Sequence, residues 1–162
     1  MAYAELATHT NFSFLRGASH ARDLVLTALA LGHTGIGIAD RNTVAGVVRA
    51  YAVLKEIRTD GLVPPDKVKE GSSPGEFVWI DTPQAGAFGF TQEEFKAAAA
   101  RFHLAVGARL VFSDDTPDVV AYPANRRGWG RLCRLLTTGN LRAGGQVGSM
   151  NVSDVLGEPK RW

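Results

Sequence analysis

The stretch that decides the fold is Gly35-Ile36-Gly37-Ile38-Ala39-Asp40-Arg41-Asn42-Thr43-Val44-Ala45-Gly46. Its first five residues are small or β-branched, which suits a strand buried on both faces. A polar corner then begins at Asp40, and a helical pattern begins at Thr43. In α/β folds the carboxyl ends of parallel strands form the edge where ligands gather. The stretch therefore predicts strand, site and helix in that order, and it places Asp40 at any chemical centre.

The residues around this stretch extend it into a strand-helix-strand-helix unit. A first short strand is predicted over 3–7, and a helix from an N-cap at Ser19 to about residue 31. The helix after the central strand is predicted over 43–58. Short connections between these elements indicate a parallel sheet. The apolar face expected for the second helix consists of Val44, Val47, Val48, Tyr51, Val53 and Leu54.

The second half of the chain is less regular. Residues 59–91 are rich in proline and glycine, so we interpret them as an insertion with one candidate strand at 77–80. A helix is predicted over 91–101, and strands over 104–112 and 119–122. Asn125 is predicted to cap a helix that runs to about 138, with Leu132, Leu135 and Leu136 directed inward. Residues 139–162 are glycine-rich at their start and are expected to be a less ordered tail with at most one short element, at 152–156.

Composition describes an ordinary globular chain. The 162 residues fit one domain or a fragment of a larger one, and 45% of them are hydrophobic. No apolar run approaches the roughly 20 residues needed to span a bilayer, and the first residues do not resemble a secretory signal. We therefore expect a cytoplasmic protein without a membrane partner. Cys133 is the single cysteine, which excludes an internal disulfide and favours a packed thiol over a nucleophile.

Positive charge is concentrated in one segment. The net charge is only +2, yet Arg126, Arg127, Arg131, Arg134 and Arg142 lie in a segment that contains no acidic residue. One interpretation is a face that contacts phosphates of DNA or a partner protein. The other is a solvated helix face whose arginines pair with acids elsewhere. The sequence leaves both open.

Most catalytic classes find no support in the motifs. The chain contains no Gly-x-Ser-x-Gly, no phosphate loop with a Gly-Lys end and no Cys-x-x-Cys. Gly35 and Gly37 lie inside the predicted strand and lack the third glycine of a dinucleotide site. His20, His33 and His103 sit at predicted helix or strand ends, where surface, capping or structural roles are expected.

Four ordered segments carry a family resemblance. Tyr3-Ala4-Glu5-Leu6-Ala7-Thr8-His9-Thr10-Asn11-Phe12-Ser13-Phe14-Leu15-Arg16-Gly17-Ala18-Ser19 is the first, and the second lies within 37–46. The third is Val106-Gly107-Ala108-Arg109-Leu110, and the fourth spans 125–139. Together they resemble successive motifs of the PHP (polymerase and histidinol phosphatase) domain, in particular that of error-prone DNA polymerases related to the bacterial replicative alpha subunit.

The departures from that family pattern fall on its metal ligands. Where intact members have His-x-His, this chain has Ala7-Thr8-His9; where they have Asp-His, it has Asp40-Arg41; and the glutamate of Gly-x-Glu is Arg109. Losing ligands weakens metal binding steeply, and two guanidinium groups repel a cation. We therefore expect no catalytic residue, no metal ligand and no cofactor here. A salt bridge from Arg41 or Arg109 to Asp40 is predicted in place of the metal. His9 is either a residual functional group or a hydrogen-bonded core residue.

The resemblance also implies a fold and a context. It implies a (β/α)7 barrel with parallel strands, partial or complete, interrupted by the insertion at 59–91. The parent protein would be a DNA-directed DNA polymerase, a nucleotidyltransferase involved in DNA replication, DNA repair after damage and translesion synthesis. Its partners would be DNA and other translesion-synthesis proteins, and this domain would act as a scaffold. Two alternatives remain. One is a metal-dependent phosphoesterase of the PHP family, and the other is a module that binds single-stranded DNA or a partner protein through the arginine-rich segment 126–142.

Overall fold

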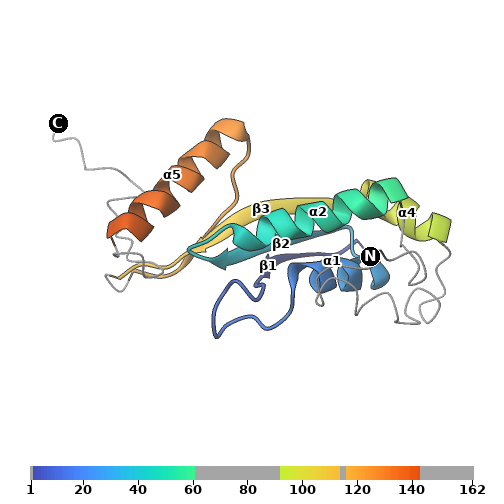
Figure 1. Ribbon diagram of the computed structural model, residues 1–162, viewed down its shortest axis with the longest axis horizontal. Coiled ribbons are helices and arrows are strands. Elements are labelled where there is room, and N and C mark those ends of the chain that lie inside the picture. Colours follow the sequence, from blue (N-terminus) through green and yellow to red (C-terminus); the bar gives the residue numbers. More distant parts are fainter. Residues whose placement is uncertain (1, 61–91, 114–115, 143–162) are drawn as a thin grey trace, which may run out of the picture.

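The computed structural model describes residues 2–60, 92–113 and 116–142. Figure 1 shows these parts as a sheet with helices packed against it. In chain order the elements are β1 (Ala4–Thr8), α1 (Ala21–Ala30), β2 (Gly35–Arg41), α2 (Ala45–Asp60), α4 (Gln92–Arg101), β3 (His103–Leu110), β4 (Val119–Ala121) and α5 (Arg126–Arg142).

The sheet has four strands in the order β1-β2-β3-β4. β1 pairs with β2 and β2 with β3 in parallel, which confirms the predicted α/β class and its parallel opening. β4 differs from the all-parallel expectation because it runs antiparallel to β3. Only residues 111–118 join these two strands, and a parallel crossover needs a connection of a dozen residues or more. The result is a mixed, curled sheet of the partial-barrel type.

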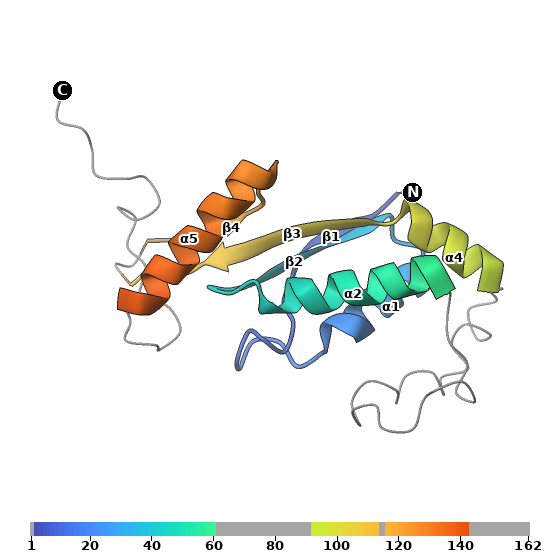
Figure 2. The same cartoon turned by 45° about the horizontal axis from the view of Figure 1, so that its top comes forward.

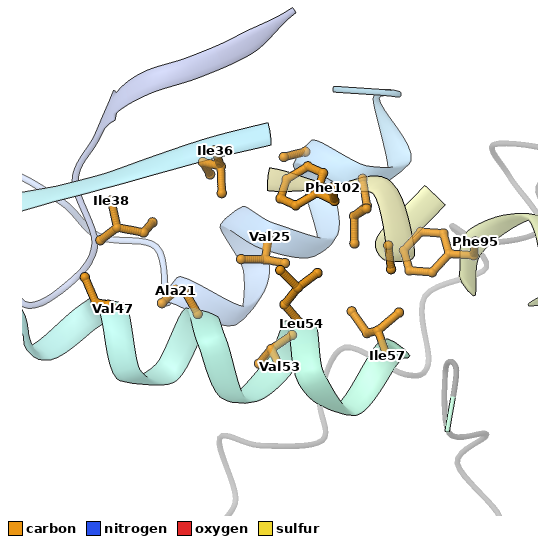
Figure 3. Packing of buried hydrophobic residues seen from close by; sticks show 14 residues of the cluster. Ala21, Val25, Ile36, Ile38, Val47, Val53, Leu54, Ile57, Phe95 and Phe102 are labelled. Atoms are coloured by element: carbon orange, nitrogen blue, oxygen red, sulfur yellow. The ribbon is translucent and has the colours of Figure 1, made fainter. Parts of the chain in front are cut away.

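The helices cover one face of this sheet, as Figure 2 shows for α1 and α2. Alternate residues of β2 point to that face, where Ile36 and Ile38 enter the main core. Figure 3 shows several of these side chains meeting between the strand and the helices. The buried members of the core are Ala21, Val25, Ala28, Leu29, Ile36, Ile38, Val47, Ala50, Val53, Leu54, Ile57, Phe95, Ala99 and Phe102.

Helix α5 packs on the same face at the other end of β3. Leu132 and Leu136 contact Ala108 and Leu110 in a second core cluster. Asn125 caps this helix as predicted, since its Oδ1 accepts a hydrogen bond from the Gly128 N–H at 2.9 Å. The helix continues to Arg142, beyond the predicted end near residue 138 and into the segment expected to be less ordered.

Two predictions about the helices are wrong in detail. Val48 and Tyr51 do not face the core, because they are 66% and 58% exposed, whereas Val47 and Leu54 are buried. Ser19 is not the N-cap of α1. That position belongs to His20, whose side chain makes no capping hydrogen bond. His20 was expected to be a surface or capping residue, and its exposed cap position agrees with that.

Several predicted features lie outside the described residues. These are the candidate strand at 77–80, most of the insertion at 59–91, and the short element at 152–156. The described parts do bracket the insertion, because α2 ends at Asp60 and α4 begins at Gln92. Among the helices described, none is both long and apolar enough to cross a bilayer.

Candidate functional site

Asp40 lies at the carboxyl end of β2 and is completely buried. Its Oδ1 accepts hydrogen bonds from the Thr10 backbone N–H and the Ser13 hydroxyl, and its Oδ2 accepts one from the Thr10 hydroxyl; all three are 2.7 Å long. Hydrogen bonds to a charged acceptor are short and about twice as strong as neutral ones. The carboxylate therefore holds the loop after β1 against the end of β2.

The same donors organise the loop itself. The Ser13 hydroxyl, besides donating to Asp40, accepts the Arg41 backbone N–H at 3.0 Å. The Thr10 hydroxyl accepts the Phe12 N–H at 3.2 Å, and the Thr10 carbonyl accepts the Ser13 N–H at 2.9 Å. Thr10 and Ser13 are themselves buried. Each of these two hydroxyl groups both donates and accepts a hydrogen bond, so both have partners within the protein.

The first turn of α2 closes over this carboxylate, and only glycine fits there. A Cβ placed on Gly46 would lie 2.3 Å from Asp40 Oδ2 and 2.6 Å from the Thr10 hydroxyl oxygen. Real Cβ atoms do not approach other atoms so closely. Gly46 thus lets the backbone of α2 pack directly against Asp40 and Thr10. The helix therefore fills the space beside Asp40 Oδ2.

Asn42 continues the sheet beyond the end of β2. Its backbone has a φ of 49°, in the left-handed region that asparagine tolerates better than most residues. Its backbone N–H donates to the Arg109 carbonyl at 2.9 Å. Its side-chain amide donates to the Val111 carbonyl at 3.1 Å and accepts the Val111 N–H at 2.9 Å. The Asn42 side chain therefore makes the pair of hydrogen bonds to Val111 that a neighbouring strand backbone would otherwise make.

Arg41 and Arg109 lie on the opposite face of the sheet from Asp40. They are direct register partners on β2 and β3, so their side chains leave the sheet on the same side. Asp40 pairs with Ala108, which belongs to the helix-covered core. The predicted salt bridge between Asp40 and either arginine is therefore wrong, because successive residues of a strand point to opposite faces.

Arg109 pairs instead with an acid from the approach to β4. Its Nη1 lies 3.7 Å from Asp118 Oδ2, and both side chains are partly exposed. The Arg109 Nε is buried and has no hydrogen-bond partner within the described residues. Arg41 forms no ion pair in that part of the chain. The two guanidinium groups therefore stand as neighbours on the face of the sheet opposite Asp40.

Tyr122 crosses this second face from β4 towards β1. Its hydroxyl donates to the Leu6 carbonyl. A Cβ on Gly107 would lie 2.6 Å from the tyrosine ring, and one on Gly37 would lie 2.5 Å from the hydroxyl oxygen. Burial, and secondarily the negative charge of Glu5, raise the pKa of Tyr122 above its ordinary value, while Arg109 lowers it in part. The tyrosine occupies this face in its neutral form.

His9 follows β1 and does not join Asp40. Its Nδ1 lies 3.0 Å from the Ala7 carbonyl oxygen, and the residue is half-buried. Its neighbour Thr8 has a buried hydroxyl oxygen without a hydrogen-bond partner in the described region. Of the four positions that the family pattern singled out, the structure thus brings together Arg41 and Arg109. It separates both from Asp40 by the thickness of the sheet.

The donor set does not fit the divalent-metal cluster that the resemblance implies. Metal ligands must be anionic or neutral lone-pair donors that converge on one point. Both Asp40 oxygens already accept hydrogen bonds, and two other positions implied as ligands are arginines on the opposite face of the sheet. In the parts of the chain that the structure describes, no three His, Cys, Asp or Glu side chains are grouped to hold an ion.

Sequence reasoning identified Asp40 but not the residues that surround it. Thr10 and Ser13 stood within the first motif, and a hydroxyl pair at spacing three, just after a strand, was the available signal for a loop held by a carboxylate. Tyr122 gave no signal of its own. Tyr122 follows β4, and the antiparallel direction of that strand places its ring over Gly107 and Gly37. The sequence did not predict that β4 is antiparallel.

Comparison with known proteins identifies the family of this chain. The family model described as "PHP domain" matches residues 5–154, so the chain belongs to the PHP domain family. It is 40% identical over 154 residues to error-prone DNA polymerase 1 of Rhizobium meliloti strain 1021, which covers 95% of this chain and 10% of the relative.

Other relatives carry the same name. An error-prone DNA polymerase of Rhodopseudomonas palustris strain BisB5 is 45% identical over 141 residues, covering 87% of this chain and 9% of the relative. One from Brucella abortus biovar 1 is 43% identical over 141 residues, with 87% and 10% coverage. The chain thus spans about a tenth of the length of the curated relatives it matches.

Proposed function

We propose that this chain is the PHP-domain portion of an error-prone DNA polymerase and that it supports that enzyme structurally, without hydrolytic chemistry of its own. The relatives it matches along 87–95% of its length are polymerases by name. The parent would synthesise DNA in repair and translesion synthesis after damage, together with other translesion proteins. No residue of this chain is assigned to nucleotide transfer.

One observation carries the structural role: both oxygens of the buried Asp40 carboxylate accept hydrogen bonds from the loop after β1. Its three hydrogen bonds tie the loop after β1 to the end of β2, and Gly46 seals the network under α2. Arg41 and Arg109 place positive charge side by side at positions where the family resemblance implies metal ligands. This arrangement holds together the loop after β1, the end of β2 and the first turn of α2. Its two arginines would repel the cation that a PHP phosphoesterase needs.

The test is a metal and activity measurement on the purified chain. We expect no stoichiometric Mn²⁺ or Zn²⁺ after dialysis, and no metal-stimulated hydrolysis of a chromogenic phosphodiester. His9→Ala is the informative variant, because His9 is half-buried and its loss leaves the Asp40 network intact. Metal-stimulated hydrolysis that falls on His9→Ala would overturn the proposal and establish the phosphoesterase alternative.

A gain-of-function variant sharpens the test. Ala7→His, Arg41→His and Arg109→Glu together restore the ligand pattern that the family resemblance implies. Arg41 and Arg109 already stand side by side on one face, so we expect the triple variant to bind Mn²⁺ or Zn²⁺ more tightly than the native chain. If the native chain bound the metal as tightly as the triple variant, the two arginines would not be what prevents binding.

A further inference from the structure

The arginine-rich helix α5 presents a single cationic face to solvent. Arg127, Arg131 and Arg134 follow each other at spacings of four and three, which places them on one side of an α-helix within an arc of about 60°. All three are exposed. The opposite side of the helix is anchored, because Leu132 and Leu136 are only 6% and 5% exposed against β3. The stripe is therefore held rigidly outward.

These three arginines are not neutralised within the described residues. None of them forms an ion pair there, which removes, for that part of the chain, the alternative of arginines paired with acids elsewhere. The helix contains five arginines and no acidic residue, so its formal charge is +5, while the whole chain carries +2. The remainder therefore carries −3 (2 − 5). The charge is segregated onto one helix instead of spread over the surface.

We propose that this α5 stripe contacts the phosphate backbone of duplex DNA. The inference rests on the proposed function, because it takes the parent protein to work on DNA. Guanidinium groups form forked hydrogen bonds with phosphate oxygens and stay charged at any working pH. From Arg127 to Arg134 the helix rises about 10 Å, a length that faces roughly three successive phosphates of one strand along a duplex axis.

The helix favours a duplex over a single strand because it offers no ring for base stacking. Proteins that bind single strands combine positive charge with exposed aromatic side chains on which bases stack. Trp129 is the one aromatic residue of α5, and it is partly buried against both core clusters. Contact through the stripe alone would depend on charge and would not distinguish base sequence.

The experiment measures binding of the full 162-residue chain to a labelled 20-base-pair duplex by fluorescence anisotropy, between 50 and 200 mM salt. Each phosphate contact contributes about −0.9 to the slope of log K against log salt, so three contacts give about −2.7. Affinity should then fall roughly 40-fold over this fourfold range of salt. A labelled single strand of equal length provides the comparison.

Three variants separate the stripe from net charge. Arg127→Ala, Arg131→Ala and Arg134→Ala together should abolish most of the salt dependence and weaken binding at 50 mM at least about tenfold. The matched control removes the same charge from exposed positions elsewhere, through Arg16→Ala, Arg49→Ala and Lys55→Ala, and should change binding less than about threefold. Replacing the three stripe arginines by lysine should retain most of the salt slope.

Several results would overturn the inference. These are no binding of duplex by the native chain, equal losses in the stripe and control variants, or tighter binding of the single strand than of the duplex. Circular dichroism spectra and thermal unfolding, expected to be unchanged in these surface variants, show that the fold is intact. Because metal-stimulated hydrolysis is read separately, failure of the DNA inference and failure of the proposed scaffold role remain distinguishable.

Discussion

Replacing Asp40 by alanine tests whether the buried carboxylate at the end of β2 is a structural centre. The change removes an acceptor for three buried hydrogen bonds, from the Thr10 N–H and the Thr10 and Ser13 hydroxyls. A hydrogen bond to a charged group contributes about 1.5–3 kcal/mol, and a buried donor left unsatisfied costs about 1–3 kcal/mol. The two hydroxyls can rotate to other partners but the backbone N–H cannot. We expect Asp40→Ala to lower the free energy of unfolding by about 3–5 kcal/mol.

The conservative change Asp40→Asn should cost less, because the geometry can absorb it. Oδ1 accepts two of the three bonds, so the amide nitrogen is best placed at the position of Oδ2, which faces the Thr10 hydroxyl. That hydroxyl can accept as well as donate. The residues would then stay connected, but the Thr10 hydroxyl proton loses its acceptor together with the negative charge, and we expect a loss of about 1–2 kcal/mol.

Urea unfolding followed by far-ultraviolet circular dichroism measures both values by linear extrapolation. The control is Asp118→Ala, which removes a carboxylate from the partly exposed pair with Arg109 and should cost less than about 1 kcal/mol. Thr10→Val provides a coupling test: combined with Asp40→Ala it should add little, because its strongest bond is already lost. If Asp40→Ala cost no more than Asp118→Ala, the reasoning about this centre would be refuted.

Three further outcomes follow from the contacts. Gly46→Ala should destabilise the chain by about 1–3 kcal/mol, because the added Cβ overlaps the buried carboxylate. Gly130→Ala in α5 should stabilise the chain by up to about 1 kcal/mol, because a Cβ there meets nothing within 4 Å. Thermal unfolding compares the two variants. Asn42→Gly keeps the positive φ but loses both side-chain hydrogen bonds, so it should lower stability in urea by about 1–3 kcal/mol, and an unchanged midpoint would count against the strand-like role of this side chain. The raised pKa of Tyr122 means that the folded state keeps its phenol proton at a pH where the unfolded chain loses it. That contribution to stability is present below the ordinary value of 10.0 and is lost as pH rises through the folded value, a decline that Tyr122→Phe should remove from the pH profile of unfolding.

Local patterns were sufficient for the elements around the fold-deciding stretch. Buried small residues with a polar end predicted β2, and Asn125 predicted the start of α5, because such signals act within a few residues. The same patterns failed for Val48 and Tyr51. An apolar residue on a helix is buried only if a neighbour covers it, and the stripe that meets the sheet runs through Val47 and Leu54.

The candidate site shows the same division. The motif departures singled out Arg41 and Arg109, which the parallel strands β2 and β3 place in register. The partner of Asp40 was assigned to the wrong face. Strand alternation alone would have separated Asp40 from Arg41, but only the packing of the loop after β1 could supply the Thr10 and Ser13 donors.

Sequence by itself determined the class of this protein, because residue types at fixed spacing indicate strands, helices and family motifs directly. Tertiary structure decided which face each side chain occupies: a fully buried carboxylate bonded to a loop, two arginines behind it, and a helix that turns three arginines to solvent. Those outcomes depend on contacts between segments far apart in the chain. Such contacts are set by packing across the sheet, which no local pattern contains.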